Sequence, residues 1–320
     1  MTRTVSSIGS RRHPHRPWPG YALLAGLALC LPGHPARAAS GAPALRAAYG
    51  EFRQQYQQLA PDIPISIHSV RSGARIRTEV FGTVDGPFPE VAQVLERPQG
   101  YCEFLPPLFN LKACVHYRKE KQSIIRFYVG GKRYSSLFGT IRILSDLRRL
   151  ANGGDYLHVQ LATVNSKTRR HGYSVDIEIA PMGRKTLARV YTDFNPDRFT
   201  RLAVAAYLHT VGGNKIGFTH VAGPDEKRDY VRGMTGIIER NTVRAFMAMQ
   251  AYLDTLTVAP EHRYDARLRR WFDLTERFPQ QLHELSRAEY LSGKRRERAE
   301  QLQLQRRLDV RRRVPDEGEP

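Results

Sequence analysis

Apolar and polar positions alternate with a period of two along the middle of the chain, which predicts β-strands. In the segment 75–84, Ile76, Val80 and Val84 fall on one face, and charged residues fall on the other. The same pattern, interrupted by turn residues, predicts further strands over 111–117, 124–129, 134–140, 156–164, 173–180, 187–194 and 202–211. Strands that follow one another at such short intervals predict an antiparallel meander.

Helical periodicity replaces this alternation on both sides of the meander and once inside it. It predicts helices over 49–60, 88–95, 142–151, 230–256, 263–276 and 280–308. The segment 230–256 contains no proline and carries an apolar stripe at helical spacing, formed by Met234, Ile238, Thr242, Ala245, Met249, Leu253 and Leu256. A helix of about seven turns is long enough to cross a whole sheet.

The first 39 residues match the pattern of a secretory signal peptide. Arg11, Arg12 and Arg16 precede an apolar run over 21–31, and small residues follow with an expected cleavage site near Ala38-Ala39. The apolar run is shorter than the roughly 20 residues that a membrane-spanning helix needs, although an uncleaved anchor is the alternative. We therefore expect a periplasmic or secreted protein.

Two cysteines, Cys102 and Cys114, remain after this segment and lie twelve positions apart. In an oxidising compartment such a pair predicts a disulfide, which would stabilise the fold by about 3 kcal/mol in the chain-entropy model. Two buried free thiols are the alternative. A metal site is not expected, because no His or Cys pair lies nearby at ligand spacing.

The chain is basic, with 50 Lys and Arg against 31 Asp and Glu. Removal of the first 39 residues takes away five arginines and leaves a net charge of about +14. Much of this excess lies near the C-terminus and not in a patch flanked by aromatic residues, so nucleic acid is not an expected partner. The run Lys294-Arg295-Arg296 is typical of a solvated helix face, and a binding patch is the alternative.

The order of the predicted elements resembles the helix-grip arrangement of the START-like (SRPBCC) superfamily. In that arrangement a strand, two short helices and a run of antiparallel strands are followed by one long C-terminal helix. The resemblance covers residues 75–256, and the segment 81–91, with the sequence FGTVDGPFPEV, is similar to the family's strand, turn and helix opening. The segments 109–114 and 238–241 also resemble uncharacterised exported proteobacterial proteins.

The resemblance implies an α+β fold in which a curved antiparallel sheet wraps around the long helix. We expect a signal peptide over 1–39, an N-terminal helix and linker over 40–70, and a helix-grip domain over 71–257. Over 258–320 we expect a basic helical extension that is disordered at its end.

The superfamily includes lipid-transfer domains, the birch-pollen allergen group and aromatic polyketide cyclases. The fold therefore implies a cavity between sheet and helix, and we predict that it binds or transports a hydrophobic or amphipathic, lipid-like small molecule. Met234, Ile238, Met249 and Leu253 would form one wall of this cavity. A filled core is the alternative, because an apolar helix stripe that faces a sheet is usually core.

Two Arg-x-Tyr pairs lie within predicted strands. Arg126 with Tyr128 and Arg189 with Tyr191 would hold an anionic head group if they pointed into the cavity, since a guanidinium offers a fixed fork of donors. The alternative is that they lie on the exposed outer face of the sheet and pair with residues of neighbouring strands.

The sequence contains no His-Glu-x-x-His, Gly-x-Ser-x-Gly or phosphate-loop motif. We therefore predict no catalytic residue, cofactor or metal, and we favour a binding protein over an enzyme. A cyclase-like activity on the same fold is one alternative. Another is an interaction protein whose basic helical tail contacts an anionic membrane surface or a partner.

Overall fold

The computed structural model describes residues 41–164, 172–198, 201–202, 215–222 and 228–313. The predicted signal peptide over 1–39 and the predicted disordered end beyond residue 313 lie outside the described residues. In the part that is described, no helix is long and apolar enough to cross a membrane.

Nine antiparallel strands form one sheet with the order β1-β2-β3-β9-β8-β7-β6-β5-β4. The strands are β1 (Gln58–Ala60), β2 (Ile63–Ser72), β3 (Arg75–Val84), β4 (Leu111–Lys119), β5 (Gln122–Val129), β6 (Ile141–Gly153), β7 (Tyr156–Thr163), β8 (Gly172–Met182) and β9 (Lys185–Asn195). A separate two-stranded sheet consists of β10 (Ile216–Ala222) and β11 (Arg228–Arg232). From β4 to β9 each strand pairs with the next along the chain, as the predicted meander requires.

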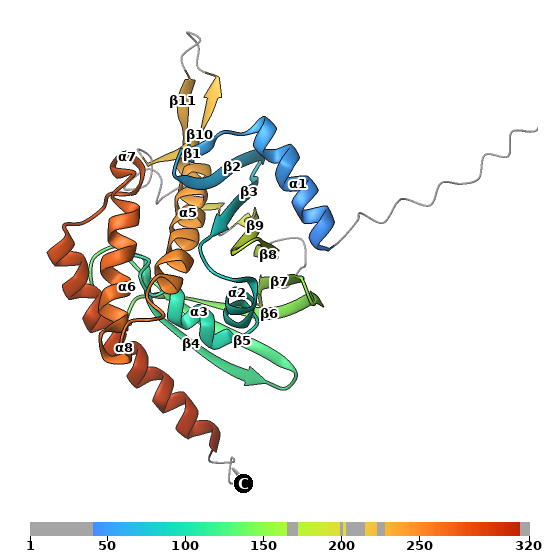
Figure 1. Ribbon diagram of the computed structural model, residues 1–320. Coiled ribbons are helices and arrows are strands. Elements are labelled where there is room, and N and C mark those ends of the chain that lie inside the picture. The colour runs from blue at the N-terminus through green and yellow to red at the C-terminus, as the bar shows by residue number, and fades with distance from the viewer. Residues whose placement is uncertain (1–40, 165–171, 199–200, 203–214, 223–227, 314–320) are drawn as a thin grey trace, which may run out of the picture. The chain divides into compact units, whose positions relative to one another are not determined.

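The described helices surround this sheet (Figure 1). They are α1 (Ala42–Gln55), α2 (Phe88–Leu95), α3 (Pro98–Phe104), α5 (Gly233–Leu253), α6 (Pro260–Thr275), α7 (Pro279–Leu282) and α8 (Arg287–Arg313). The strand β3, the short helices α2 and α3, the meander β4–β9 and the long helix α5 follow in the predicted order. The strand order closes β3 onto β9, and α5 packs against β3, so the predicted helix-grip fold is confirmed.

One predicted helix is wrong. The segment 142–151 lies within β6, which pairs with β5 on one side and β7 on the other. Its apolar residues Ile143, Leu144 and Leu147 fit both a helical and a strand period, so the local pattern does not separate the two. Backbone hydrogen bonds to the two neighbouring strands make this segment a strand.

Other predicted boundaries also differ. The segment 134–140 is a loop and not a strand, and β11 replaces the first residues of the predicted helix over 230–256. The first helix begins seven residues earlier than predicted, at Ala42, and β1 occupies its predicted end. Leu202, which opens the predicted strand over 202–211, is helical, and the rest of that segment lies outside the described residues.

The two faces of the sheet have different partners. On the inner face, which faces α5, Val80, Ile179 and Ala188 join the main apolar core. Gly82 allows α5 to approach closely, because a Cβ atom there would lie 2.7 Å from Phe246 Cζ. On the outer face, α1 packs against an aromatic and aliphatic cluster that includes Phe81.

The C-terminal helix α8 covers the exposed edge of the sheet. The ammonium of Lys294 donates to the carbonyl oxygen of the first residue of β4 (2.8 Å). Gln301 accepts from the backbone N–H of Cys114 (3.0 Å), and Gln305 both accepts from and donates to the backbone of His116. Side chains of α8 thus occupy hydrogen-bonding groups that an edge strand would otherwise expose.

The predicted disulfide between Cys102 and Cys114 is present and joins α3 to β4. Both cysteines are buried. Gln301 of α8 also donates to the carbonyl oxygen of Cys102 (3.0 Å), so one glutamine side chain holds the backbone of both cysteines.

Candidate ligand-binding surface

An incompletely covered apolar surface lies on the inner face of the central strands. We call it the inner patch, and it consists of Leu161 on β7, Val175 and Ile177 on β8, and Val190 on β9. Strand register places Leu161 opposite Val175 and Ile177 opposite Val190, so the four side chains are neighbours. All four are half-buried, whereas the inner-face residues toward the other end of these strands are fully buried.

The predicted helical wall is mostly core. Ile238, Met249 and Leu253 are buried, and Met249 and Leu253 belong to the same cluster as the inner face of the sheet. Met234, near the start of α5, is half-buried. This part of the space between sheet and helix is therefore filled by side chains, while the inner patch is incompletely covered. Contact between these four residues and a ligand stays a prediction.

The two Arg-x-Tyr pairs lie on the outer face and so do not line the space beside α5. Arg189 forms ion pairs with Glu79 (2.6 Å) and Glu178 (2.9 Å) and lies over the ring of Phe81. Tyr191 lies opposite Glu79 on the same face. This geometry matches the alternative, in which the pair lies on the outer face of the sheet and contacts residues of neighbouring strands.

The other pair lies on the outer face near α8. Tyr128 is buried in a cluster with Ala113 and Val115 that also contacts Leu304 and Leu308 of α8. Arg126 lies over the ring of Tyr117 and donates to its hydroxyl group (3.1 Å). These contacts give Arg126 and Tyr128 structural partners in the absence of any ligand.

A single buried carboxylate holds four cations between α5 and the start of α8. Oε1 of Glu284 accepts from Arg240 and from Arg244 (3.1 Å). Oε2 accepts from Lys132 and from Lys215 (3.0 Å). Burial alone would raise the pKa of Glu284, but the hydrogen bond from Lys132 and the charge of Arg244 outweigh it and lower the pKa to about 2. The cluster joins four segments that are distant in sequence.

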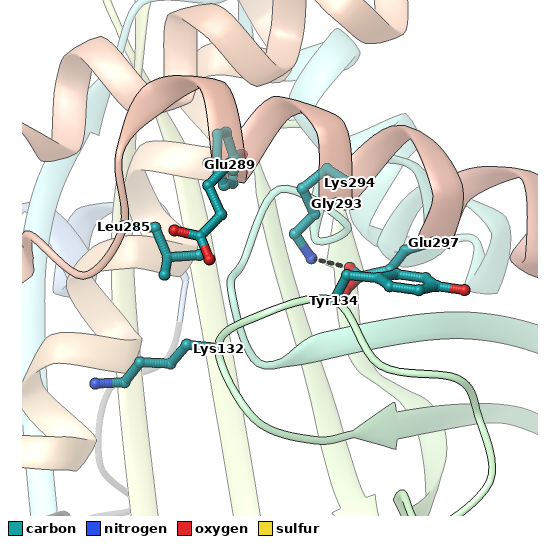
Figure 2. A pocket seen from close by; sticks show the side chains of 8 residues that line it. Lys132, Tyr134, Leu285, Glu289, Gly293, Lys294 and Glu297 are labelled. Carbon is teal, nitrogen blue, oxygen red and sulfur yellow. Dashed lines mark hydrogen bonds and ion pairs between the residues drawn. The ribbon is translucent and has the colours of Figure 1, made fainter.

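A second buried carboxylate joins α8 to β4. Glu297 forms ion pairs with Lys112 (2.7 Å) and Lys294 (2.7 Å), and all three side chains are almost fully buried. Burial lowers the pKa of Lys294 to about 8 although the charge of Glu297 opposes the shift. Figure 2 shows Lys294 and Glu297 side by side on α8, with the ammonium of Lys132 pointing away from them.

The pocket beside this second cluster is small. It is lined by Lys132, Tyr134, Leu285, Glu289, Tyr290, Gly293, Lys294 and Glu297 (Figure 2). Its volume of about 10 Å³ matches roughly one water molecule, so it does not fit an organic ligand. Within the described ranges, no group of three His, Cys, Asp or Glu side chains is arranged to hold a metal ion.

Sequence reasoning missed both buried charge clusters. Glu284 falls inside the predicted helix over 280–308, but the structure divides this segment into α7 and α8 and places Glu284 in the connection between them. The helical period therefore does not mark this position as buried. Its lysine partners lie about 70 and 150 positions earlier in the chain. A buried ion pair between such distant positions leaves no local signal, so only the folded chain reveals it.

No protein-family model and no curated protein matches the chain. Among solved structures, it is similar to a STAR-related lipid transfer protein from Xanthomonas axonopodis at 8% identity, over 61% of this chain and 95% of that protein, with a TM-score of 0.38. It is also similar to human STARD10 at 9% identity, over 75% and 84% of the two chains, with a TM-score of 0.34.

A third similar structure is the di-domain ARO/CYC protein StfQ from the steffimycin biosynthetic pathway. The identity is 9%, the match covers 57% of this chain and 51% of that protein, and the TM-score is 0.35. Because all three TM-scores are below 0.5, these neighbours carry no argument about activity. The helix-grip assignment rests on the strand order and on the long helix α5.

Proposed function

We propose that the protein binds a hydrophobic or amphipathic, lipid-like small molecule at the inner patch. The observation that carries this proposal is the contrast along the inner face, where buried core gives way to four half-buried apolar side chains. Covering apolar surface is favourable by about 25 cal/mol per Å², so a ligand that completes the coverage gains affinity. Met234 at the start of α5 is also half-buried, and a flexible thioether side chain suits a ligand of variable shape.

The cellular part of the proposal comes from the sequence. The signal-like pattern of the first 39 residues and the oxidised cysteine pair support binding or transport in the periplasm or outside the cell. Native mass spectrometry of protein purified from the periplasm of its own cells tests this directly. A copurifying lipid-like molecule is expected. Its absence, together with no binding of added lipid, would contradict the proposal.

The substitution Leu161→Arg is expected to weaken binding of the uncharged fluorescent probe N-phenyl-1-naphthylamine to the folded protein at least tenfold. A charged side chain in the inner patch would have to lose water when the probe binds, which is unfavourable. Leu144→Arg is the matched control, because Leu144 is also half-buried but lies on the outer face. Fluorescence titration measures both affinities. Equal losses in the two variants would place the probe elsewhere.

A second candidate function is association of α8 with an anionic membrane surface. Along the last turns of α8, Leu302 and Val310 are 44% and 61% exposed, and Arg306 between them is also exposed. An exposed helix face that mixes apolar and basic side chains is typical of membrane-surface binding. For the cyclase-like alternative, the described residues offer no comparable observation.

The double substitution Arg306→Glu and Val310→Asp is expected to abolish sedimentation with vesicles of 70% phosphatidylcholine and 30% phosphatidylserine at low salt. Each basic residue near such a surface contributes about 1 kcal/mol, and added salt screens the attraction. Arg184→Glu, in the exposed turn between β8 and β9, is the control for a change of net charge. Failure of the unsubstituted protein to sediment would rule out this second function.

A further inference from the structure

A polar groove crosses the outer face of the sheet, on the side opposite the inner patch. Its volume is about 530 Å³, which lies within the range of roughly 300–1,000 Å³ that ligand sites occupy. It is lined by Arg75, Gln122, Asp146, Arg148, Gln160, Ala162, Thr163, Val164, Gly172, Tyr173, Ser174, Asp193 and Asn195. Strand register places Asp193, Ser174, Ala162 and Asp146 in one row across four strands.

The groove is long. It extends from Arg75 on β3 to Gln122 on β5, across six neighbouring strands. With about 4.8 Å between strands, this span is roughly 24 Å. A ligand that contacts both ends of the groove must therefore be extended.

The side chains of the groove are held in place, and their charges cancel. Arg75 donates from Nε to Oδ1 of Asp193 (2.7 Å), and Arg148 donates from Nε to Oδ2 of Asp146 (2.8 Å). The two carboxylates are largely covered, whereas the guanidinium side chains are 42% and 50% exposed. Each pair thus presents further N–H donors to the groove without net charge.

Gln160 is fixed in the same way. Its amide nitrogen donates to both oxygens of Asp176, at 3.0 and 3.3 Å, so its carbonyl oxygen is oriented by a neighbouring strand. Side chains held on rigid strands lose little conformational freedom when they bind a ligand. The groove therefore offers oriented donors and acceptors at several points along its length.

We propose that this groove binds an uncharged oligosaccharide chain. Hydroxyl groups both donate and accept hydrogen bonds, which matches alternating guanidinium, amide and hydroxyl side chains. An extended peptide is usually held by the free backbone groups of an edge strand, whereas the strands under this groove are paired on both sides from β9 to β6.

Isothermal titration calorimetry with cellohexaose and chitohexaose tests the proposal on the folded, oxidised protein. We expect binding of at least one hexasaccharide in the micromolar to millimolar range. Arg148→Ala and Gln160→Ala are each expected to weaken it at least tenfold. The matched control Arg184→Ala, at the opposite end of β8 and β9, is expected to leave the affinity unchanged.

Three results would overturn the proposal. The first is absence of heat and of amide chemical-shift changes with both sugars at millimolar concentration. The second is binding that Arg148→Ala, Gln160→Ala and the exposed Gln122→Ala all leave unchanged. The third is equal affinity for the peptide (Gly-Ser)₃ with acetylated and amidated ends, which is uncharged, because that would make the groove a peptide site. Leu161→Arg should not affect sugar binding, so this test is independent of the lipid-like ligand proposed for the inner patch.

Discussion

Replacement of Glu284 by glutamine is expected to lower the free energy of unfolding by about 3–5 kcal/mol, because it removes the carboxylate that four cations share. Arg240 and Arg244 are almost fully buried, so they cannot regain water without local unfolding. Loss of one partner of a buried ion pair is costly for this reason, even where the pair itself contributes little net stability. Urea denaturation followed by circular dichroism measures the change.

Glu289→Gln is the matched control for this substitution. Glu289 lies five residues further along, and its ion pair with Arg133 (2.9 Å) joins side chains that are 40% and 77% exposed. Exposed pairs contribute about 0–1 kcal/mol, so the control should be close to the unsubstituted protein. If both variants lose the same stability, the Glu284 cluster does not have the energetic role that its burial implies.

The pH dependence gives a second measurement of the same cluster. The pKa of Glu284 is about 2 in the folded protein, against an ordinary value of 4.5. Its contribution is therefore fully present above pH 4.5 and is lost as the pH falls from 4.5 toward 2. A shift of this size corresponds to about 3 kcal/mol. The difference in stability between the unsubstituted protein and Glu284→Gln should shrink over this interval, and a constant difference would contradict the assignment.

The elements that the sequence predicted most accurately are those whose signals are local. The strand β3 and the helix α2 have the predicted bounds, because the turn at Gly86-Pro87 separates a clear two-residue period from a clear helical one. The order of elements then determined the helix-grip topology. In contrast, β6 carries a pattern that fits either period, and only pairing with β5 and β7 makes it a strand.

The candidate sites were less predictable than the fold. Periodicity identified the apolar stripe of α5, but it could not show that Met249 and Leu253 are buried core while the inner patch on β7–β9 is incompletely covered. The face of the sheet on which each Arg-x-Tyr pair lies depends on strand register, because a one-residue shift would move the pair to the other face. The outer groove depends on six strands lying side by side, and no single segment carries a signal for it.

The role of the C-terminal extension also depends on contacts between distant segments. Its basic composition predicted a solvated helix, yet Lys294, Gln301 and Gln305 reach the edge of β4. Arg287 and Arg295 of α8 pair with Asp273 and Asp265 of α6, and Arg306 and Arg307 are exposed, so the basic composition is compatible with docking. The helix covers the edge strand and the disulfide at once, which connects its packing to the stability of α3 and β4.

The double substitution Cys102→Ser and Cys114→Ser is expected to lower the free energy of unfolding by about 3 kcal/mol, because the unfolded chain regains the freedom of a loop of about twelve residues. The variant keeps the backbone groups that Gln301 contacts, so α8 can still dock. Urea denaturation of both proteins, with and without dithiothreitol, separates the effect of the bond from that of the side chains. Reduction should bring the unsubstituted protein close to the variant and leave the variant unchanged. Equal stability of the oxidised protein and the variant would show that the bond does not brace the fold.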